Sequence, residues 1–280
     1  GGEQGGGGKA DIINVEFEFF DPSEKDYHGL HTILRKWLGN DAQMSDDWNN
    51  ALRNLADILS NQASVGTLIK CDTAEDTPPL AFISAISLYT HRKSSIMKFI
   101  RSYLTKRAPS NAKKNFQKVW KSGVSGKKPI GLLIHERLIN VPPALVPVLH
   151  AELTKDLDWA QKNEITQELR SSFKFNELVY ITRAYYPEDD ADKSAPKATK
   201  SGKKKKSAKE EKISSNRQWF RFEDEILEDI SSLSFSFPLT PKTDASQGLD
   251  LLAQELVVMV LPVSRLPEAI TRAAWFLSQE

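Results

Sequence analysis

The feature that most constrains the fold is a nearly continuous apolar run at 255–261, ELVVMVL. A strand that is apolar on both faces must be covered on both sides, which places it at the centre of a sheet. Other segments have strand patterns, at 11–20, 65–70, 80–88, 130–134, 175–186, 217–222 and 233–239. Helical apolar spacing lies between them, at 26–39, 45–59, 94–107, 109–120, 142–157 and 264–277. This order predicts an α/β (α+β) fold, a single domain with a mixed central sheet flanked by helices.

Capping residues locate two of these helices more closely. Ser45 is a good N-cap, and Asp46 and Asp47 follow it in the first turn, where the helix dipole favours negative charge. Ser264 is expected to cap the last helix. The apolar face of that helix is predicted to contain Leu266, Ile270, Ala274 and Leu277.

Two segments are predicted to be disordered. Residues 1–10 form a glycine-rich tail, and residues 187–216 contain Ile213 as their one large aliphatic residue among many Lys, Ser and Ala. Because a strand pattern resumes at 217–222, we expect a hairpin with a long tip and a single domain over 11–280. The tip contains a run that is typical of a nuclear import signal, Lys203, Lys204, Lys205 and Lys206.

The net charge of +1 conceals a strong asymmetry, since 91–128 contains twelve Lys or Arg and no acidic residue. The rest of the chain therefore carries −11 by the same count. The basic tract predicts either contact with phosphates or a solvated face that meets an acidic protein. Its candidate contact residues are Lys93, Lys98, Arg101, Lys106, Arg107, Lys113, Lys114 and Lys118.

The stretch HER at 135–137 follows an apolar strand, where α/β enzymes often place reactive side chains. Neighbouring residues of an extended chain point to opposite faces, so His135 and Glu136 are poorly placed to act as a dyad. We therefore interpret Glu136 and Arg137 as anchors of the corner before Pro142, with 135–141 a turn or short extension. The loop KSGVSGKK at 121–128 follows a helix and precedes a strand, which is the wrong context for a phosphate cradle.

The common catalytic and metal-binding motifs, such as G-x-S-x-G, Walker A, H-E-x-x-H and paired C-x-x-C, are absent from the sequence. We therefore predict no catalytic, cofactor-binding or metal-binding residues. Cys71 is the single cysteine, which suits a reducing compartment. The apolar run at 256–261 is far shorter than a membrane span, and the glycine-rich start is unlike a secretory signal, so no membrane association is expected.

Three stretches resemble the BCCIP family: INVEFEFFDP with DYHGL at 13–30, LLIHERLINVPPALVPVLHAEL at 132–153, and the basic low-complexity loop before QWFRFEDEIL at 218–227. The resemblance implies a nuclear protein that shuttles to the cytoplasm and acts as an adaptor or chaperone, not as an enzyme. Its fungal members imply roles in nuclear export, ribosome biogenesis and the handling of a basic large-subunit ribosomal protein. Its animal members imply partners in genome maintenance. The implied fold is similar to that of GCN5-related acetyltransferases.

Two alternatives to the chaperone remain, an acetyltransferase-like protein and an RNA-binding assembly factor, both using 91–128. The junction at 86–95, which corresponds to the acetyl-CoA loop of such acetyltransferases, contains no glycine. For the chaperone, an acidic cluster is expected to replace the phosphates that a ribosomal protein meets on RNA. This cluster consists of Glu223, Asp224, Glu225, Glu228 and Asp229.

Overall fold

One mixed sheet forms the centre of the molecule. The computed structural model describes residues 16–71, 77–187, 217–240 and 252–279. The strand order is β1-β2-β3-β4-β5-β8-β7, and β6 pairs with β5. All neighbours are antiparallel except β4 and β5, which pair in parallel over 130–133 and 177–180. The strands are β1 Phe17–Phe20, β2 Thr67–Cys71, β3 Ala81–Ser87, β4 Ile130–Arg137, β5 Glu177–Tyr186, β6 Gln218–Trp219, β7 Leu233–Pro238 and β8 Ala253–Pro262.

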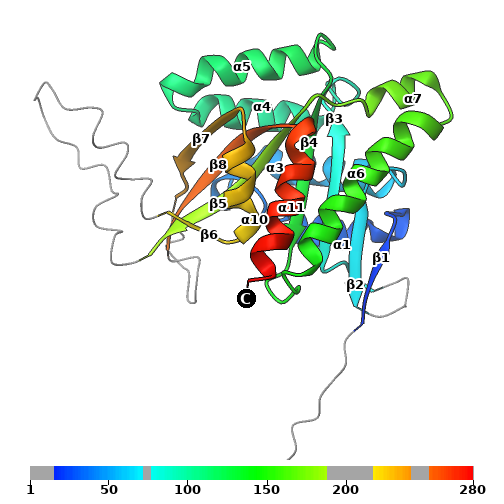
Figure 1. Cartoon of the computed structure of the whole chain (residues 1–280). Helices are drawn as coiled ribbons and strands as arrows, with labels where there is room; N and C mark the ends of the chain where they lie inside the picture. The colour runs from blue at the N-terminus through cyan, green and yellow to red at the C-terminus, as the bar shows by residue number, and fades with distance from the viewer. Residues whose placement is uncertain (1–15, 72–76, 188–216, 241–251, 280) are drawn as a thin grey trace, which may run out of the picture.

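Helices cover both faces of this sheet (Figure 1). One face carries α1 Tyr27–Leu34, α3 Asp46–Ser60, α4 Ser95–Arg107 and α5 Ser110–Val124, with the short α2 Asn40–Gln43 between the first two. The other face carries α6 Leu145–Asn163, α10 Phe222–Ile230 and α11 Leu266–Leu277, and α7 Gln167–Ser172 follows α6. These two helical layers are called the α4–α5 layer and the α6–α11 layer below.

The sheet separates two hydrophobic cores, and β8 contributes to both. Leu256 and Val258 pack in the core beneath the α4–α5 layer, whereas Val257 and Met259 pack beneath the α6–α11 layer. Because successive side chains of a strand point to opposite faces, this confirms that the apolar run is an interior strand covered by helices on both sides. It does not lie at the centre as predicted, since β8 lies between β5 and the edge strand β7. In the described residues, no helix is both long enough and apolar enough to cross a bilayer.

Several boundaries differ from the prediction. The strand predicted to end at 134 continues to Arg137, because β4 pairs with β3 through that residue. The strand predicted at 217–222 is reduced to two residues, because α10 begins at Phe222. The expected pairing across the insertion is present, with Ala184 opposite Trp219. Helices α2, α7 and α10 were not predicted.

The last helix uses a different face from the one predicted. Leu266, Ala269 and Ala273 are buried, whereas Ala274 is exposed, so the prediction of an inward Ala274 was wrong. Small residues at 269 and 273 allow α11 to lie close to α6. Ser264 lies in a short 3-10 helix, Val263–Arg265, and the N-cap of α11 is Arg265.

The predicted tail at 1–10 and all but the first residue of the predicted insertion at 187–216 lie outside the described residues. The same holds for Lys203, Lys204, Lys205 and Lys206 of the predicted import signal.

Candidate functional site

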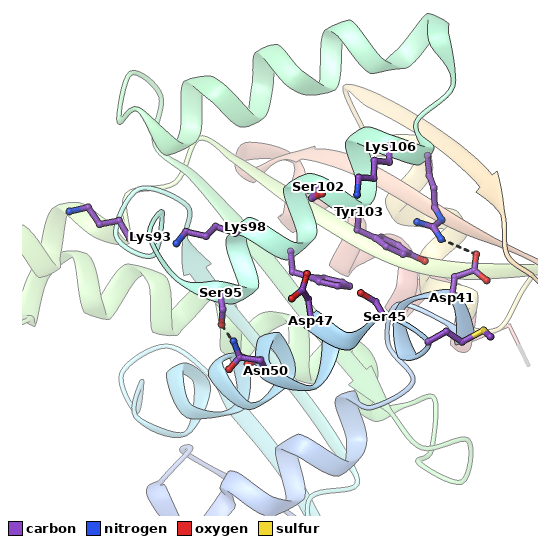
Figure 2. Close-up of a pocket in the computed structure, with 13 residues that line it drawn as sticks. Asp41, Ser45, Asp47, Asn50, Lys93, Ser95, Lys98, Ser102, Tyr103 and Lys106 are labelled. Atoms are coloured by element: carbon purple, nitrogen blue, oxygen red, sulfur yellow. Dashed lines mark hydrogen bonds and ion pairs between the residues drawn. The ribbon is translucent and has the colours of Figure 1, made fainter.

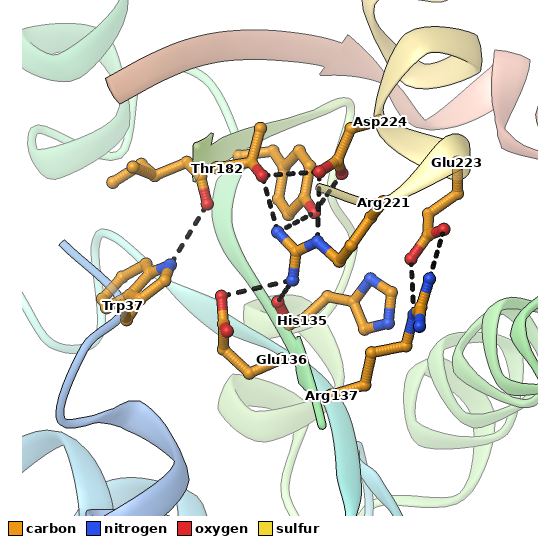
Figure 3. A network of polar contacts seen from close by, with 10 residues as sticks. Trp37, His135, Glu136, Arg137, Thr182, Arg221, Glu223 and Asp224 are labelled. Atoms are coloured by element: carbon orange, nitrogen blue, oxygen red, sulfur yellow. Dashed lines mark hydrogen bonds and ion pairs between the residues drawn. The ribbon is translucent and has the colours of Figure 1, made fainter. Parts of the chain in front are cut away.

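The stretch at 135–137 lies in a buried polar network where β4 and β5 separate (Figure 3). Once the strands part, carbonyl groups that would pair in a continuous sheet need other donors. The guanidinium of Arg221 donates to the carbonyl of His135 at 2.7 Å, and the indole Nε1 of Trp37 donates to the carbonyl of Ile181 at 3.1 Å. Side chains from α10's N-cap and from the turn after α1 therefore fill the space between the strands.

Arg221 is the hub of this network. Its guanidinium also donates to Asp224 at 3.0 Å, to Glu136 at 3.2 Å, to the hydroxyl of Tyr180 at 2.9 Å and to that of Thr182 at 2.6 Å. Both hydroxyls donate in turn to Asp224, at 2.7 and 2.6 Å. Burial raises the pKa of Tyr180 well above its usual value, which keeps this hydroxyl a donor. These side chains therefore make their hydrogen bonds with one another, within the network.

A second buried ion pair fixes α10 to β4. Arg137 contacts both carboxylate oxygens of Glu223, at 3.1 and 3.2 Å. Both side chains are less than 10% exposed. Glu136 and Arg137 have structural roles, but the prediction that they anchor the corner before Pro142 was wrong, because Arg137 pairs with Glu223 of α10 and Glu136 with its N-cap Arg221.

The side chain of His135 lies beside this network, between Arg221 and Arg137, and contacts His150 of α6 (Figure 3). The two rings contact edge to face, with centroids 4.8 Å apart. Burial holds the pKa of His135 well below its usual value and lowers that of His150 to about 4, so both imidazoles are neutral at pH 7. Within the described residues, both ring nitrogens of His135 and the Nε2 of His150 have no hydrogen-bond partner.

The structure divides the predicted acidic cluster. Glu223 and Asp224 are 2% and 0% exposed and are bound to arginines, so the expectation that they contact a partner was wrong. Glu228 is half-buried and pairs with Arg217. The exposed members of the cluster are Glu225 and Asp229. Local sequence could not reveal this division, because the arginine that neutralises Glu223 lies 86 residues away.

The exposed acids of α10 lie beside an apolar stretch of α11. Phe222 stacks on Phe276 with ring centroids 5.4 Å apart, and Glu225 is one turn further along the same face of α10. Asp229, one turn beyond, accepts from Arg272 at 2.6 Å. The surface formed by 222, 225 and 229 of α10 and by 268, 272, 275 and 276 of α11 is called the α10–α11 strip. Trp275 and Phe276 are 64% and 43% exposed.

Exposed apolar side chains are concentrated on this side of the molecule. Among the described residues, eleven large apolar side chains are exposed, and eight of them lie in 138–169 or in α11. These eight are Leu138, Ile139, Val148, Trp159, Ile165, Leu169, Trp275 and Phe276. Sequence analysis missed this set, because exposure of single apolar residues is not visible in a periodic pattern.

The basic tract forms a single helical hairpin in the α4–α5 layer (Figure 1). All eight predicted contact residues are exposed or half-exposed on this hairpin or just before it: Lys93, Lys98, Arg101, Lys106, Arg107, Lys113, Lys114 and Lys118. Arg107 stacks on Tyr103 and pairs with Asp41 at 3.6 Å. Their exposure is compatible with the contact surface predicted from charge, which stays a prediction.

A cleft of about 830 Å³ lies between α4 and the α2–α3 region (Figure 2). Lys93, Lys98 and Lys106 line one side, and Asp41 and Asp47 line the other. Its mixed charge suits neither a purely anionic nor a purely cationic ligand.

The junction between β3 and α4 is a self-bonded turn. The N–H groups of Thr90 and His91 donate to the hydroxyl and carbonyl of Ser87, and that of Ser94 donates to the carbonyl of His91 at 2.9 Å. A pyrophosphate cradle needs free backbone N–H groups. The geometry therefore agrees with the absence of glycine in arguing against an acetyl-CoA loop at this position. Within the described residues, no three His, Cys, Asp or Glu side chains are placed to hold a metal ion.

Comparison with known proteins was made at three levels. The sequence model of the BCCIP family matches residues 12–227. Protein bcp1 of Emericella nidulans is 33% identical over 280 aligned residues, which cover 96% of this chain and 90% of that protein. Protein BCCIP homolog of Arabidopsis thaliana is 26% identical, covering 91% and 72%. The crystal structure of BCP1 from Saccharomyces cerevisiae superimposes with a TM-score of 0.63 at 22% identity, covering 96% and 94%, which shows a common fold.

Proposed function

Since the chain belongs to the BCCIP family, we propose that it is a non-enzymatic nuclear adaptor and chaperone that binds a basic protein of the large ribosomal subunit. Membership of this family supports an adaptor role. In this proposal the protein supports ribosome biogenesis and nuclear export, and it shuttles between nucleus and cytoplasm. The single observation that carries the binding role is the concentration of exposed apolar side chains on the α6–α11 layer.

The α10–α11 strip is the proposed contact surface. Protein interfaces are enriched in aromatic residues, and a few buried aromatic anchors supply most of the binding free energy. Trp275 and Phe276 are such aromatic residues, and they are exposed here. Exposed carboxylates surround them, those of Glu225, Asp229 and Glu268.

The charge of the surrounding helices favours a basic partner. Helices α6, α7, α10 and α11 together contain ten acidic and four basic residues, a net charge of −6. Ion pairs with Arg272 already neutralise part of this charge at the surface. Exposed ion pairs contribute roughly 0–1 kcal/mol, so a basic partner can exchange them at little cost. The carboxylates then steer association, while the aromatic side chains supply affinity.

The test begins with affinity capture from RNase-treated nuclear extract, followed by titration with the purified ribosomal protein that is identified. Trp275→Ala is expected to weaken binding by at least tenfold, because truncating an aromatic anchor typically costs about 2 kcal/mol or more. Met44→Ala is the matched control, since Met44 is 82% exposed and lies outside the α6–α11 layer. If the two variants bind with equal affinity, the α10–α11 strip is not part of the interface.

Charge reversal at Glu225 and Asp229 tests the steering role. Glu225→Lys with Asp229→Lys is expected to slow association and to reduce its salt dependence. Glu223 and Asp224 are unsuitable for this test, because they are buried in ion pairs and their reversal would disrupt the fold. If no basic large-subunit ribosomal protein is captured from the RNase-treated extract, the chaperone proposal fails.

A further inference from the structure

A groove of about 630 Å³ lies between α4 and α5, and every charged side chain that lines it is basic. Its floor contains the buried side chains of Met97 and Trp120 together with Val124. Its polar rim contains two hydroxyls, those of Ser102 and Thr105. The basic residues of the rim are Arg92, Lys98, Arg101 and Lys106. Unlike the cleft beside α3, this groove can accept an anion without an opposing carboxylate.

The charge of the hairpin is largely uncompensated. Helices α4 and α5 contain eight basic residues and no acidic residue, a net charge of +8. Among the described residues, the one ion pair found between this hairpin and a carboxylate joins Arg107 to Asp41. Like charges at this density repel one another, so the hairpin gains stability when anions bind it.

Two lysines oppose the intrinsic electrostatics of their helix. Lys113 and Lys114 lie near the N-terminus of α5, where the helix dipole favours negative charge. No acidic residue is present in that first turn. Neither lysine lines the groove, but both add to the positive potential around it.

The composition of this surface distinguishes between two kinds of anionic partner. Protein interfaces are depleted in Lys and enriched in exposed aromatic residues. The basic tract at 91–128 contains nine Lys and three Arg. None of the eleven exposed large apolar side chains of the described residues belongs to it. Such a surface is typical of one that contacts phosphates, whose recognition depends on charge and is independent of sequence.

We infer that the α4–α5 groove binds the phosphate backbone of a nucleic acid. The four basic side chains of the groove rim contact successive phosphates, and the hydroxyls of Ser102 and Thr105 donate to phosphate oxygens. The groove lies in the helical layer opposite the α10–α11 strip, so nucleic acid and a protein can be bound together (Figure 1). This inference does not rest on the proposed ribosomal-protein partner, and each is tested with a different ligand.

The test measures binding of a fluorescent 20-nucleotide RNA, and of a DNA of the same length, by anisotropy over a range of salt concentrations. Four phosphate contacts predict a slope of log K against log salt of roughly −3. The triple variant Lys98→Glu, Arg101→Glu, Lys106→Glu is expected to abolish binding. A milder variant, Lys98→Gln with Lys106→Gln, is expected to reduce the magnitude of the slope by roughly 1.4.

The matched control reverses three exposed lysines of other surface regions, Lys155→Glu, Lys162→Glu and Lys174→Glu, and changes the net charge by the same amount. It is expected to retain tight, salt-dependent binding, with circular dichroism confirming that both triple variants are folded. If both triple variants lose the same amount of affinity, the effect is one of net charge, and the groove is not the binding site. If neither oligonucleotide binds, the ligand is not a nucleic acid. The same conclusion would follow if a polyglutamate peptide bound more tightly than RNA and displaced it. Tighter binding of RNA than of DNA would identify RNA as the ligand.

Discussion

Replacing Arg221 by methionine should destabilise the protein more than any exposed substitution. The change removes five donated hydrogen bonds and leaves Asp224, which is 0% exposed, without its cation. Removing one partner of a buried ion pair costs about 3–5 kcal/mol. Because a typical domain is stable by about 5–15 kcal/mol, the variant should lose a large part of its free energy of unfolding.

The size of this loss should depend on pH. Burial raises the pKa of Asp224, with Arg221 acting against that rise, so removing Arg221 raises the pKa further. A carboxyl with a raised folded-state pKa stabilises the protein below its unfolded pKa of about 3.9, and this contribution is lost as pH rises through the folded pKa. The variant should therefore lose about 4 kcal/mol at pH 8 and less at pH 5.

Urea denaturation followed by circular dichroism at pH 5 and pH 8 measures both effects. Arg272→Met is the control, since Arg272 pairs with Asp229 at the surface and its loss should cost under about 1 kcal/mol. The double variant Arg221→Met, Asp224→Asn should recover at least about 1 kcal/mol relative to Arg221→Met at pH 8, because the unpaired charge is gone. A loss at pH 8 no larger than that of the control would refute the role of the network.

Three further predictions concern other parts of the fold. Burial raises the pKa of Asp156 to about 6, so its contribution to stability is lost as pH rises from about 4 through 6, and Asp156→Asn should flatten the pH dependence of the urea midpoint in this range. Burial lowers the pKa of His150 to about 4, so His150 should lower the stability by about 3 kcal/mol as pH decreases from about 6.5 through 4; His150→Phe should remove this part of the loss and leave the part due to His135, whose pKa is also lowered by burial. Gly39 has a φ of 77°, and an added Cβ would lie 2.6 Å from a methyl of Leu239, so Gly39→Ala should lower the free energy of unfolding by at least about 1–2 kcal/mol, measured by urea denaturation.

Sequence patterns predicted the parts of this fold that depend on local periodicity. The apolar run of β8 identified an interior strand, although not its place beside the edge strand β7, and the charge of 91–128 identified a pair of basic helices. Helix α10 was missed, although Ile226, Leu227 and Ile230 have helical spacing, because its five acidic residues indicated an exposed acidic cluster. Burial of one of these acids, Glu223, requires Arg137 from a distant strand.

The polar network could not be predicted either, because it also depends on contacts between distant parts of the chain. Its donors and acceptors come from separate segments of the chain, and only Arg221 and Asp224, three residues apart, form a local pair. The separation of β4 and β5 that calls for Trp37 is a property of the assembled sheet. The face of α11 depended on its contact with α6, because Ala269 and Ala274 are equally compatible with an inward position in sequence alone.

The wide sequence separations within the network have a kinetic consequence. Trp37 and Ile181 are 144 residues apart, and Arg221 and His135 are 86 apart, so these bonds close only after α1, α10 and both strands have docked. Interactions that form after the rate-limiting step slow unfolding and leave the folding rate nearly unchanged. A contribution of about 4 kcal/mol would lengthen the lifetime of the native state by roughly a thousandfold. We therefore expect the polar network between β4 and β5 to slow unfolding, and to have little effect on the rate at which the chain folds.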